Sequence, residues 1–364
     1  MANLRGIDVG FRSDHLLTMR TAPARTMTHV DRMNYYDRVL TGVLALPGVE
    51  NAAFVSDLPF QQQGNSQGFQ IEGRPALQNG PVQISLYRVG TNDYLKTLGV
   101  KVLEGRLFEP SDSASAPPVI VVTETLVKQF FMGESAVGHR LQVGGAKAPW
   151  ATIVGVAADV HERGYEPAMM PGVYVPVVQA PYTGSIPREL LIRTKQVPMA
   201  LAEPVRRVVW SVNPQQPVAR IRTMEEWIDL DVADRKQQTA LLGIFAGVAL
   251  LLASIGLYGV LSYAVTQRSR EIGLRIALGA SAGNVTRMVV EHGLGLTGIG
   301  VAAGFAISWV ATRTMSNLLF GVRATDPATF FIVAAILAAI AATACWIPAR
   351  RASRVDPAVV LREE

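Results

Sequence analysis

Five histidines are the first candidates for chemistry, because histidine is a common general base and metal ligand. No two stand within one helical turn of each other; they are His15, His29, His139, His161 and His292. Glu162 follows His161, but no second histidine follows at the spacing of a zinc-dependent protease. The single cysteine, Cys345, excludes an intrachain disulfide and a cysteine-based zinc site. The sequence therefore predicts no metal site.

Other catalytic patterns are absent from the sequence as well. No G-x-x-x-x-G-K-[ST] phosphate-binding loop and no G-x-S-x-G elbow occurs, so the chain has no P-loop with which to hydrolyse ATP. Gly144-Gly145 predicts a hairpin turn. Asp57, Asp93 and Asp112 stand beside Pro, Ser or Asn, which predicts turn and cap roles. We therefore expect no enzymatic activity and no cofactor.

The most distinctive local feature is the run 270–281, REIGLRIALGAS. It predicts a short helix with a Glu271–Arg275 pair one turn apart and a stop at Gly279, followed by Ser281 as the N-cap of the next helix. One interpretation is a basic helix on a membrane surface. The apolar residues alternate, however, and so point to several sides of the helix; they are Ile272, Leu274, Ile276 and Leu278. This favours burial between the membrane and a protein partner.

The elements that carry these residues follow from composition. The chain has 364 residues, 49% of them hydrophobic and only 17% charged, where about 25% charged is usual for soluble domains. Residues 1–238 hold 24 basic and 23 acidic residues, and residues 239–364 hold 10 basic and six acidic ones. Uncharged runs at 239–265, 293–312 and 328–348 each reach the ~20 residues needed to cross a bilayer. Three buried helices of a soluble core are the alternative, but such helices are usually shorter and carry a polar face. We predict three membrane spans.

Arginine distribution predicts the orientation of the spans. The loop 266–292 and the tail 349–364 hold eight arginines, which are Arg268, Arg270, Arg275, Arg287, Arg350, Arg351, Arg354 and Arg362. Both segments are therefore predicted to be cytoplasmic and the N-terminal part extracytoplasmic. The net charge of +5 thus predicts membrane lipid as a partner and no nucleic acid. No span contains Asp, Glu, Lys, Arg or His, which disfavours an ion-coupled carrier. The Gly300-x-x-x-Gly304 pair predicts close helix packing.

Alternating and β-branched patterns predict an α+β fold with two subdomains for residues 1–222. The predicted strands are 15–20, 50–55, 68–72, 82–89, 119–123, 152–156, 172–177 and 190–194, and the predicted helices are 31–46, 92–98, 124–131 and 198–212. Residues 223–238 predict a stalk helix that continues into the first span, because no Gly or Pro interrupts it. The N-terminus shows no signal peptide, so we expect a membrane helix upstream of it in the natural polypeptide.

Three groups of motifs resemble those of the FtsX-like/MacB-like permeases, the membrane subunits of mechanotransmitting ABC transporters. The first is 252–281; the second is the outer loop 318–322 with Asp326-Pro327. The third is the tail with Pro348, Arg350, Arg351, Asp356 and Pro357. The N-terminal part resembles the MacB-like periplasmic core through 105–108, 119–126 and 138–141. In detail the chain is similar to the duplicated orphan permeases of acidobacteria.

The resemblance implies a bacterial inner-membrane protein with four spans, of which this chain lacks the first. It also implies a coupling helix that docks on an ABC ATPase in trans; the corresponding residues are Arg270, Glu271, Ile272, Arg275, Gly279 and Ala280. A second permease half or a homodimer, and an extracytoplasmic or outer-membrane partner, are implied as well. The leading hypothesis is a permease subunit for efflux or mechanotransmission. The alternatives are a non-transporting regulator of an extracytoplasmic partner and an orphan permease without an ATPase.

Overall fold

The computed structural model describes two units, Met1–Asp234 and Arg235–Glu364. The described residues are 8–24, 26–61, 64–74, 83–165, 168–180 and 185–267, with single positions beyond: 287, 291, 295, 298–300, 302–304, 306, 307, 335 and 339.

The first unit is α+β, as predicted. Its strands are β1 (Leu16–Arg20), β2 (Val49–Val55), β3 (Ser66–Ile71), β4 (Ile84–Gly90), β5 (Val102–Gly105), β6 (Val119–Thr123), β7 (Arg140–Val143), β8 (Trp150–Ala157), β9 (Gly172–Pro176), β10 (Glu189–Thr194) and β11 (Ala219–Thr223). Its helices are α1 (His29–Leu44), α2 (Tyr94–Leu98), α3 (Glu124–Phe130), α4 (Ala202–Val212) and the start of α5 (Met224–Gln267), with short 3-10 turns at η2 (Val177–Gln179) and η3 (Pro198–Leu201).

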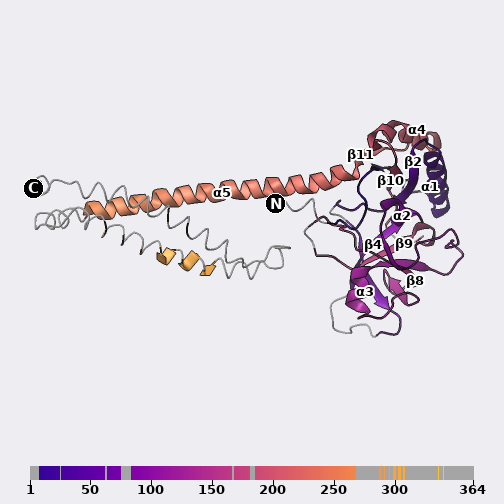
Figure 1. Cartoon of the computed structure of the whole chain (residues 1–364), viewed down its shortest axis with the longest axis horizontal. Helices are drawn as coiled ribbons and strands as arrows, with labels where there is room; N and C mark the ends of the chain where they lie inside the picture. The colour runs from indigo at the N-terminus through magenta and orange to yellow at the C-terminus, as the bar shows by residue number, and fades with distance from the viewer. Residues whose placement is uncertain are drawn as a thin grey trace, which may run out of the picture. The chain divides into compact units, whose positions relative to one another are not determined.

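Part of the sheet is open and covered by helices on both faces. Its strand order is β11-β1-β10-β2, with β4 beside β2. Successive side chains of a strand point to opposite faces. On one face, Leu17 and Leu190 pack in a core cluster with residues of α1 and α4. These two helices lie beside each other (Figure 1). Leu16 and Leu191 pack on the opposite face, in a core cluster shared with α2 and the first turns of α5.

The rest of the sheet closes into a ring. Its neighbours run β4-β3-β7-β8-β6-β9, and β9 returns to pair in parallel with β4. Strand β5 pairs with β8 outside this path. Strand β4 belongs to both parts, because it also pairs with β2 through Gly90 and Val55. The ring therefore joins the open sheet at β4.

All eight predicted strands are confirmed, with ends that differ by at most two residues. Three strands were not predicted from the sequence: β5, β7 and β11. Strand β5 is mostly exposed and β11 carries arginines, so neither shows a buried apolar pattern. The predicted strand 68–72 begins two residues earlier in the structure, at Ser66, where β3 already pairs with β4.

Helix α5 is uninterrupted across the residues predicted as stalk and first span. It runs from Met224 to Gln267, 44 residues in all. Within the described part of the chain, one helical segment is long and apolar enough to cross a membrane, the 21 residues Ala240–Val260. The predicted spans at 293–312 and 328–348 fall largely outside the described residues.

Candidate functional site

Helix α5 starts at a capping box formed by Thr223 and Glu226. The Glu226 backbone N–H donates to Thr223 Oγ1 at 3.1 Å, and the Thr223 N–H donates to Glu226 Oε2 at 3.3 Å. This reciprocal arrangement satisfies backbone groups that a helix start otherwise leaves unpaired. Thr223 is also the last residue of β11. The sheet edge and the long helix are therefore joined with no intervening loop.

The first turns of α5 are packed into the first unit. Met224 is fully buried, and Ile228 is buried beside it in the core cluster that contains Phe60 and Val160. Trp227 Nε1 donates to Thr18 Oγ1 of β1 at 3.0 Å. The Arg222 guanidinium lies 4.9 Å from the centre of the Trp227 ring system, within cation–π range. Apolar burial and polar contacts together fix the beginning of the helix.

The segment 158–165, which we name the hub loop, follows β8 and touches the buried side of α5. Gly164 adopts a φ of +98°, and a Cβ at this position would lie 2.8 Å from Oδ1 of Asp231. Asp231 is itself buried. Only glycine accommodates both this backbone angle and this close approach. The hub loop and the second turn of α5 are thus in direct contact.

On its other side the hub loop makes a buried ion pair with the strand ring. Glu162 Oε2 accepts from Arg88 Nε of β4 at 3.0 Å, and Glu162 Oε1 accepts from the Tyr174 hydroxyl of β9 at 3.1 Å. The side chains of Arg88 and Glu162 are 1% and 5% exposed. A charge this deep in the protein requires a partner, since an isolated buried ion is strongly destabilising.

Burial and charge determine which groups near Glu162 carry protons. Burial, and then the Glu162 carboxylate, raise the pKa of Tyr174 and of Tyr94 well above the ordinary tyrosine value. Both tyrosines therefore remain neutral, and Tyr174 acts as a hydrogen-bond donor. Burial tends to lower the pKa of Arg88, but Glu162 and other neighbouring groups more than offset this, and the net pKa is raised. Arg88 therefore remains a cation inside the protein.

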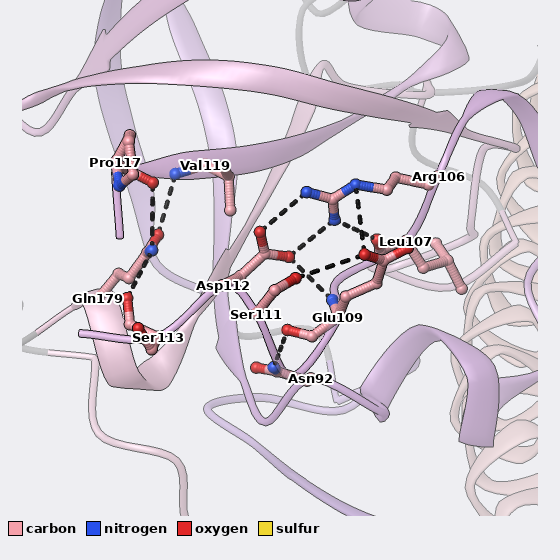
Figure 2. Close-up of polar contacts among 10 residues, drawn as sticks. All are labelled: Asn92, Arg106, Leu107, Glu109, Ser111, Asp112, Ser113, Pro117, Val119 and Gln179. Atoms are coloured by element: carbon pink, nitrogen blue, oxygen red, sulfur yellow. Dashed lines mark hydrogen bonds and ion pairs between the residues drawn. The ribbon is translucent and has the colours of Figure 1, made fainter. Parts of the chain in front are cut away.

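A second polar network organises the connection between β5 and β6. Figure 2 shows the Arg106 guanidinium facing the Asp112 carboxylate, with bonds of 2.8 Å from Nη1 and 2.9 Å from Nη2. Asp112 Oδ2 also accepts from the Glu109 N–H at 2.8 Å. The hydrogen bond from Arg106 and the backbone donor outweigh burial and lower the pKa of Asp112. This ionised aspartate fixes the turn, which confirms its predicted role.

The same network extends to both ends of that connection. Asn92 Nδ2 donates to the Glu109 carbonyl at 2.8 Å. Gln179 donates to the Ser113 carbonyl at 3.0 Å and accepts from the Val119 N–H at 2.9 Å. These contacts join the β5–β6 connection to Asn92, which precedes α2, and to Gln179, the last residue of η2 (Figure 2). The network is a structural brace, because its hydrogen bonds join the β5–β6 connection to two other segments of the first unit.

Most predicted functional residues lie outside the described part of the chain. This applies to the coupling-helix residues Arg270, Glu271, Ile272, Arg275, Gly279 and Ala280, and to the tail residues Pro348, Arg350, Arg351, Asp356 and Pro357. Gly300 and Gly304 are described and helical, and among the described residues no atom lies within 4 Å of a Cβ built on either. Their role in helix packing stays a prediction.

Sequence reasoning did not find the contacts around the hub loop. Arg88 gave one signal, since an arginine inside the apolar stretch Leu86–Gly90 indicates a buried partner. That partner, Glu162, lies 74 residues away, which no local pattern reveals. Gly164 and Asp231 gave no signal, because a single glycine in a polar segment is typical of any turn.

Comparison with known proteins places both parts of the chain. Residues 4–215 match the MacB-like periplasmic core domain, and residues 243–357 match the FtsX-like permease C-terminal domain. The macrolide export ATP-binding/permease protein MacB of Marinobacter nauticus is 29% identical over 275 residues, which cover 72% of this chain and 41% of that protein. The protein of the same name from Chromobacterium violaceum is 25% identical over 304 residues, with coverages of 80% and 45%.

This chain spans less than half the length of both relatives. Among solved structures, the periplasmic region of MacB from Actinobacillus actinomycetemcomitans aligns with a TM-score of 0.42 and 13% identity, over 62% of this chain and 94% of that one. The MacB-like core model alone covers more than half of the present chain. The chain therefore belongs to the FtsX-like/MacB-like family of ABC transporter permeases.

Proposed function

We propose that this protein is a permease subunit, or half-permease, that transmits the motion of a cytoplasmic ABC ATPase to its extracytoplasmic domain, for efflux or mechanical work on a partner there. The observation that carries this proposal is the continuity of α5. The helix is anchored in the first unit by Met224 and continues unbroken through the apolar segment Ala240–Val260. At 1.5 Å per residue, its 44 residues extend about 66 Å. In this proposal, the helix carries motion from one of its ends to the other.

The proposed topology has three spans in this chain, at 239–265, 293–312 and 328–348. The loop 266–292 and the tail 349–364 are cytoplasmic in this arrangement, and the MacB-like domain is periplasmic. The arginine distribution supports this orientation, because the eight arginines of the loop and tail lie on one side. A second permease half, or a second copy of this chain, would complete the membrane part.

ATP hydrolysis is proposed to belong to a separate subunit. The matched relatives are named ATP-binding/permease proteins, whereas the present chain contains no P-loop motif. The coupling helix proposed to meet that subunit is 270–280, with Glu271 as its acidic contact. An ATPase docking surface at this position would move the lower end of α5, which ends at Gln267.

The test is recovery of an ABC ATPase with the affinity-tagged full chain from its native host, identified by mass spectrometry. We expect Glu271→Arg to reduce the recovered ATPase about tenfold, equivalent to about 1.4 kcal/mol of binding free energy. The matched control is Glu291→Arg, a charge reversal in the same loop at a residue that pairs only with exposed Arg287 in the described structure.

Undiminished recovery with Glu271→Arg would remove the coupling role of 270–280. If no ATPase is recovered with the unmodified chain, the permease proposal gives way to the other two hypotheses. A copurifying extracytoplasmic protein would then favour a regulator, and its absence would favour an orphan permease.

A further inference from the structure

The hub loop forms hydrogen bonds with three separate segments of the first unit. The His161 N–H donates to the Val9 carbonyl at 3.1 Å, and the Phe60 N–H donates to the Glu162 carbonyl at 3.1 Å. Arg163 Nη2 donates to Ser66 Oγ of β3 at 3.1 Å. The loop therefore binds the N-terminal segment, the segment after β2 and the strand ring at once.

Two buried contacts of the hub loop involve different elements of the first unit. Gly164 packs against Asp231 on α5, while Glu162, two residues earlier, binds Arg88 on β4. Strand β4 is the strand that the ring shares with the open sheet. The contact with Asp231 and the contact with β4 therefore lie within three residues of each other in the hub loop.

The surroundings of the hub loop are held under strain. Phe60 is buried with a φ of +65°, a conformation that bulky residues rarely adopt. Its ring packs edge-on against Tyr165 at 5.1 Å and against Phe11 at 6.3 Å. Such strained residues persist only where the neighbouring packing fixes them, and they cluster at switch regions.

The buried polar groups here are also incompletely paired. Among the described residues, the buried Nη2 of Arg88, Nε of Arg163 and hydroxyl of Tyr94 have no hydrogen-bond partner. Native interiors usually leave few such groups, and each one lowers stability. A cluster with these properties is poorly suited to maximal stability and well suited to rearrangement.

We propose that the hub loop is the joint through which displacement of the first turns of α5 reaches the strand ring, by way of the Asp231–Gly164 contact and the Glu162–Arg88 ion pair. This inference rests on the proposed function, because it names the contacts by which α5 would drive the periplasmic domain. Thermodynamic coupling is reciprocal, so a change at either contact must affect the structure at the other.

The test is hydrogen–deuterium exchange of the full chain in lipid nanodiscs, read by mass spectrometry. Glu162→Gln is expected to accelerate exchange in the first turns of α5, residues 224–233, by about fivefold or more. Asp231→Asn is expected to accelerate exchange in β4 and β9 by a similar factor. The matched control is Asp112→Asn, which also removes a buried carboxylate from an arginine pair. It should accelerate exchange around 106–113 and leave α5 unchanged.

The proposal would be overturned if each substitution accelerated hydrogen exchange only around the substituted residue and left the other contact unchanged. A second pair of variants covers the case in which Glu162→Gln loosens the whole domain. Gly164→Ala and Gly144→Ala impose the same backbone strain, at φ values of +98° and +97°, but only Gly164 faces another group within 4 Å. Gly164→Ala should therefore accelerate exchange in both α5 and β4, and Gly144→Ala in neither. Equal effects of the two would again contradict the proposal.

No ATPase takes part in this experiment. If exchange does not accelerate at the distant contact, the ATPase-coupled function still stands, but motion of α5 must reach the strand ring through other contacts. Failure to recover an ATPase would leave the exchange result intact.

Discussion

At the scale of single residues, local sequence context predicted roles correctly only where the partner is close in the chain. Asp112 fixes a turn through the Glu109 N–H and holds Arg106 six residues away, which a turn signal anticipates. For Asp57, the turn signal gave no hint of the partner that the structure shows: its carboxylate binds Arg188 at 2.9 Å, 131 residues away. The fold, and not the neighbouring residues, brings such pairs together.

The Arg88–Glu162 pair gives a prediction at this scale. Arg88→Met leaves Glu162 buried without its counter-charge, so we expect the free energy of unfolding of the periplasmic part to fall by about 3–5 kcal/mol. Urea unfolding of the full chain, followed by circular dichroism, measures the loss. The control is Arg140→Met, which breaks a half-exposed pair with Glu72 and should cost about 1 kcal/mol or less. Equal losses would show that burial does not determine the strength of the pair.

At the scale of elements, periodicity located the buried strands and the main helices, because each buries a regular face. Strand β6 is buried at all five positions, and its run of Val and Ile identifies it. The edge strand β11 has no such face, and its pairing with β1 is visible only in the structure. The continuity of α5 was predicted from the lack of Gly and Pro in 223–238, but its packing into the core through Met224 was not.

The start of α5 gives the prediction at this scale. Thr223→Ala removes the acceptor of the Glu226 N–H and should cost about 0.5–2 kcal/mol of helix stability. Faster hydrogen exchange at the amides of Glu225 and Glu226 would report this loss. Thr28→Ala is the matched control, because Thr28 caps α1 through the Asp31 N–H at 3.1 Å and should leave α5 unchanged. Thr223→Ser retains the hydroxyl and should restore protection.

At the scale of the whole molecule, composition alone predicted a division between an ordinary soluble part and a membrane part. The numbers of charged residues on either side of residue 238 indicate this division. Membrane spans exclude charged residues, and arginines are enriched in the cytoplasmic loops between them. The family comparison supports the same division, with one domain model on each side. Composition could not predict the ring, because ring closure depends on the long-range pairing of β4 with β9.

The single cysteine makes the proposed topology measurable. In a Cys345→Ala background, Ser115→Cys and Ser281→Cys each supply one thiol, in the exposed β5–β6 connection and in the loop 266–292. A membrane-impermeant maleimide, applied to spheroplasts, should label Ser115→Cys and spare Ser281→Cys until the membrane is permeabilised. Labelling of Ser281→Cys in intact spheroplasts would reverse or refute the proposed orientation.

The path of the chain through the two parts of the sheet bears on how such a protein diversifies. Every strand of the ring lies in the stretch between β2 and β10, and these two strands are themselves direct neighbours, with Val55 opposite Glu189. The ring is thus an insertion whose entry and exit are adjacent. Evolution, or an engineer, can therefore alter the strands of the ring while β2 and β10 keep their pairing, provided that the hub loop within the insertion keeps its contact with α5. The surface of the ring can therefore change in sequence without any change in the pairing of β1, β2, β10 and β11.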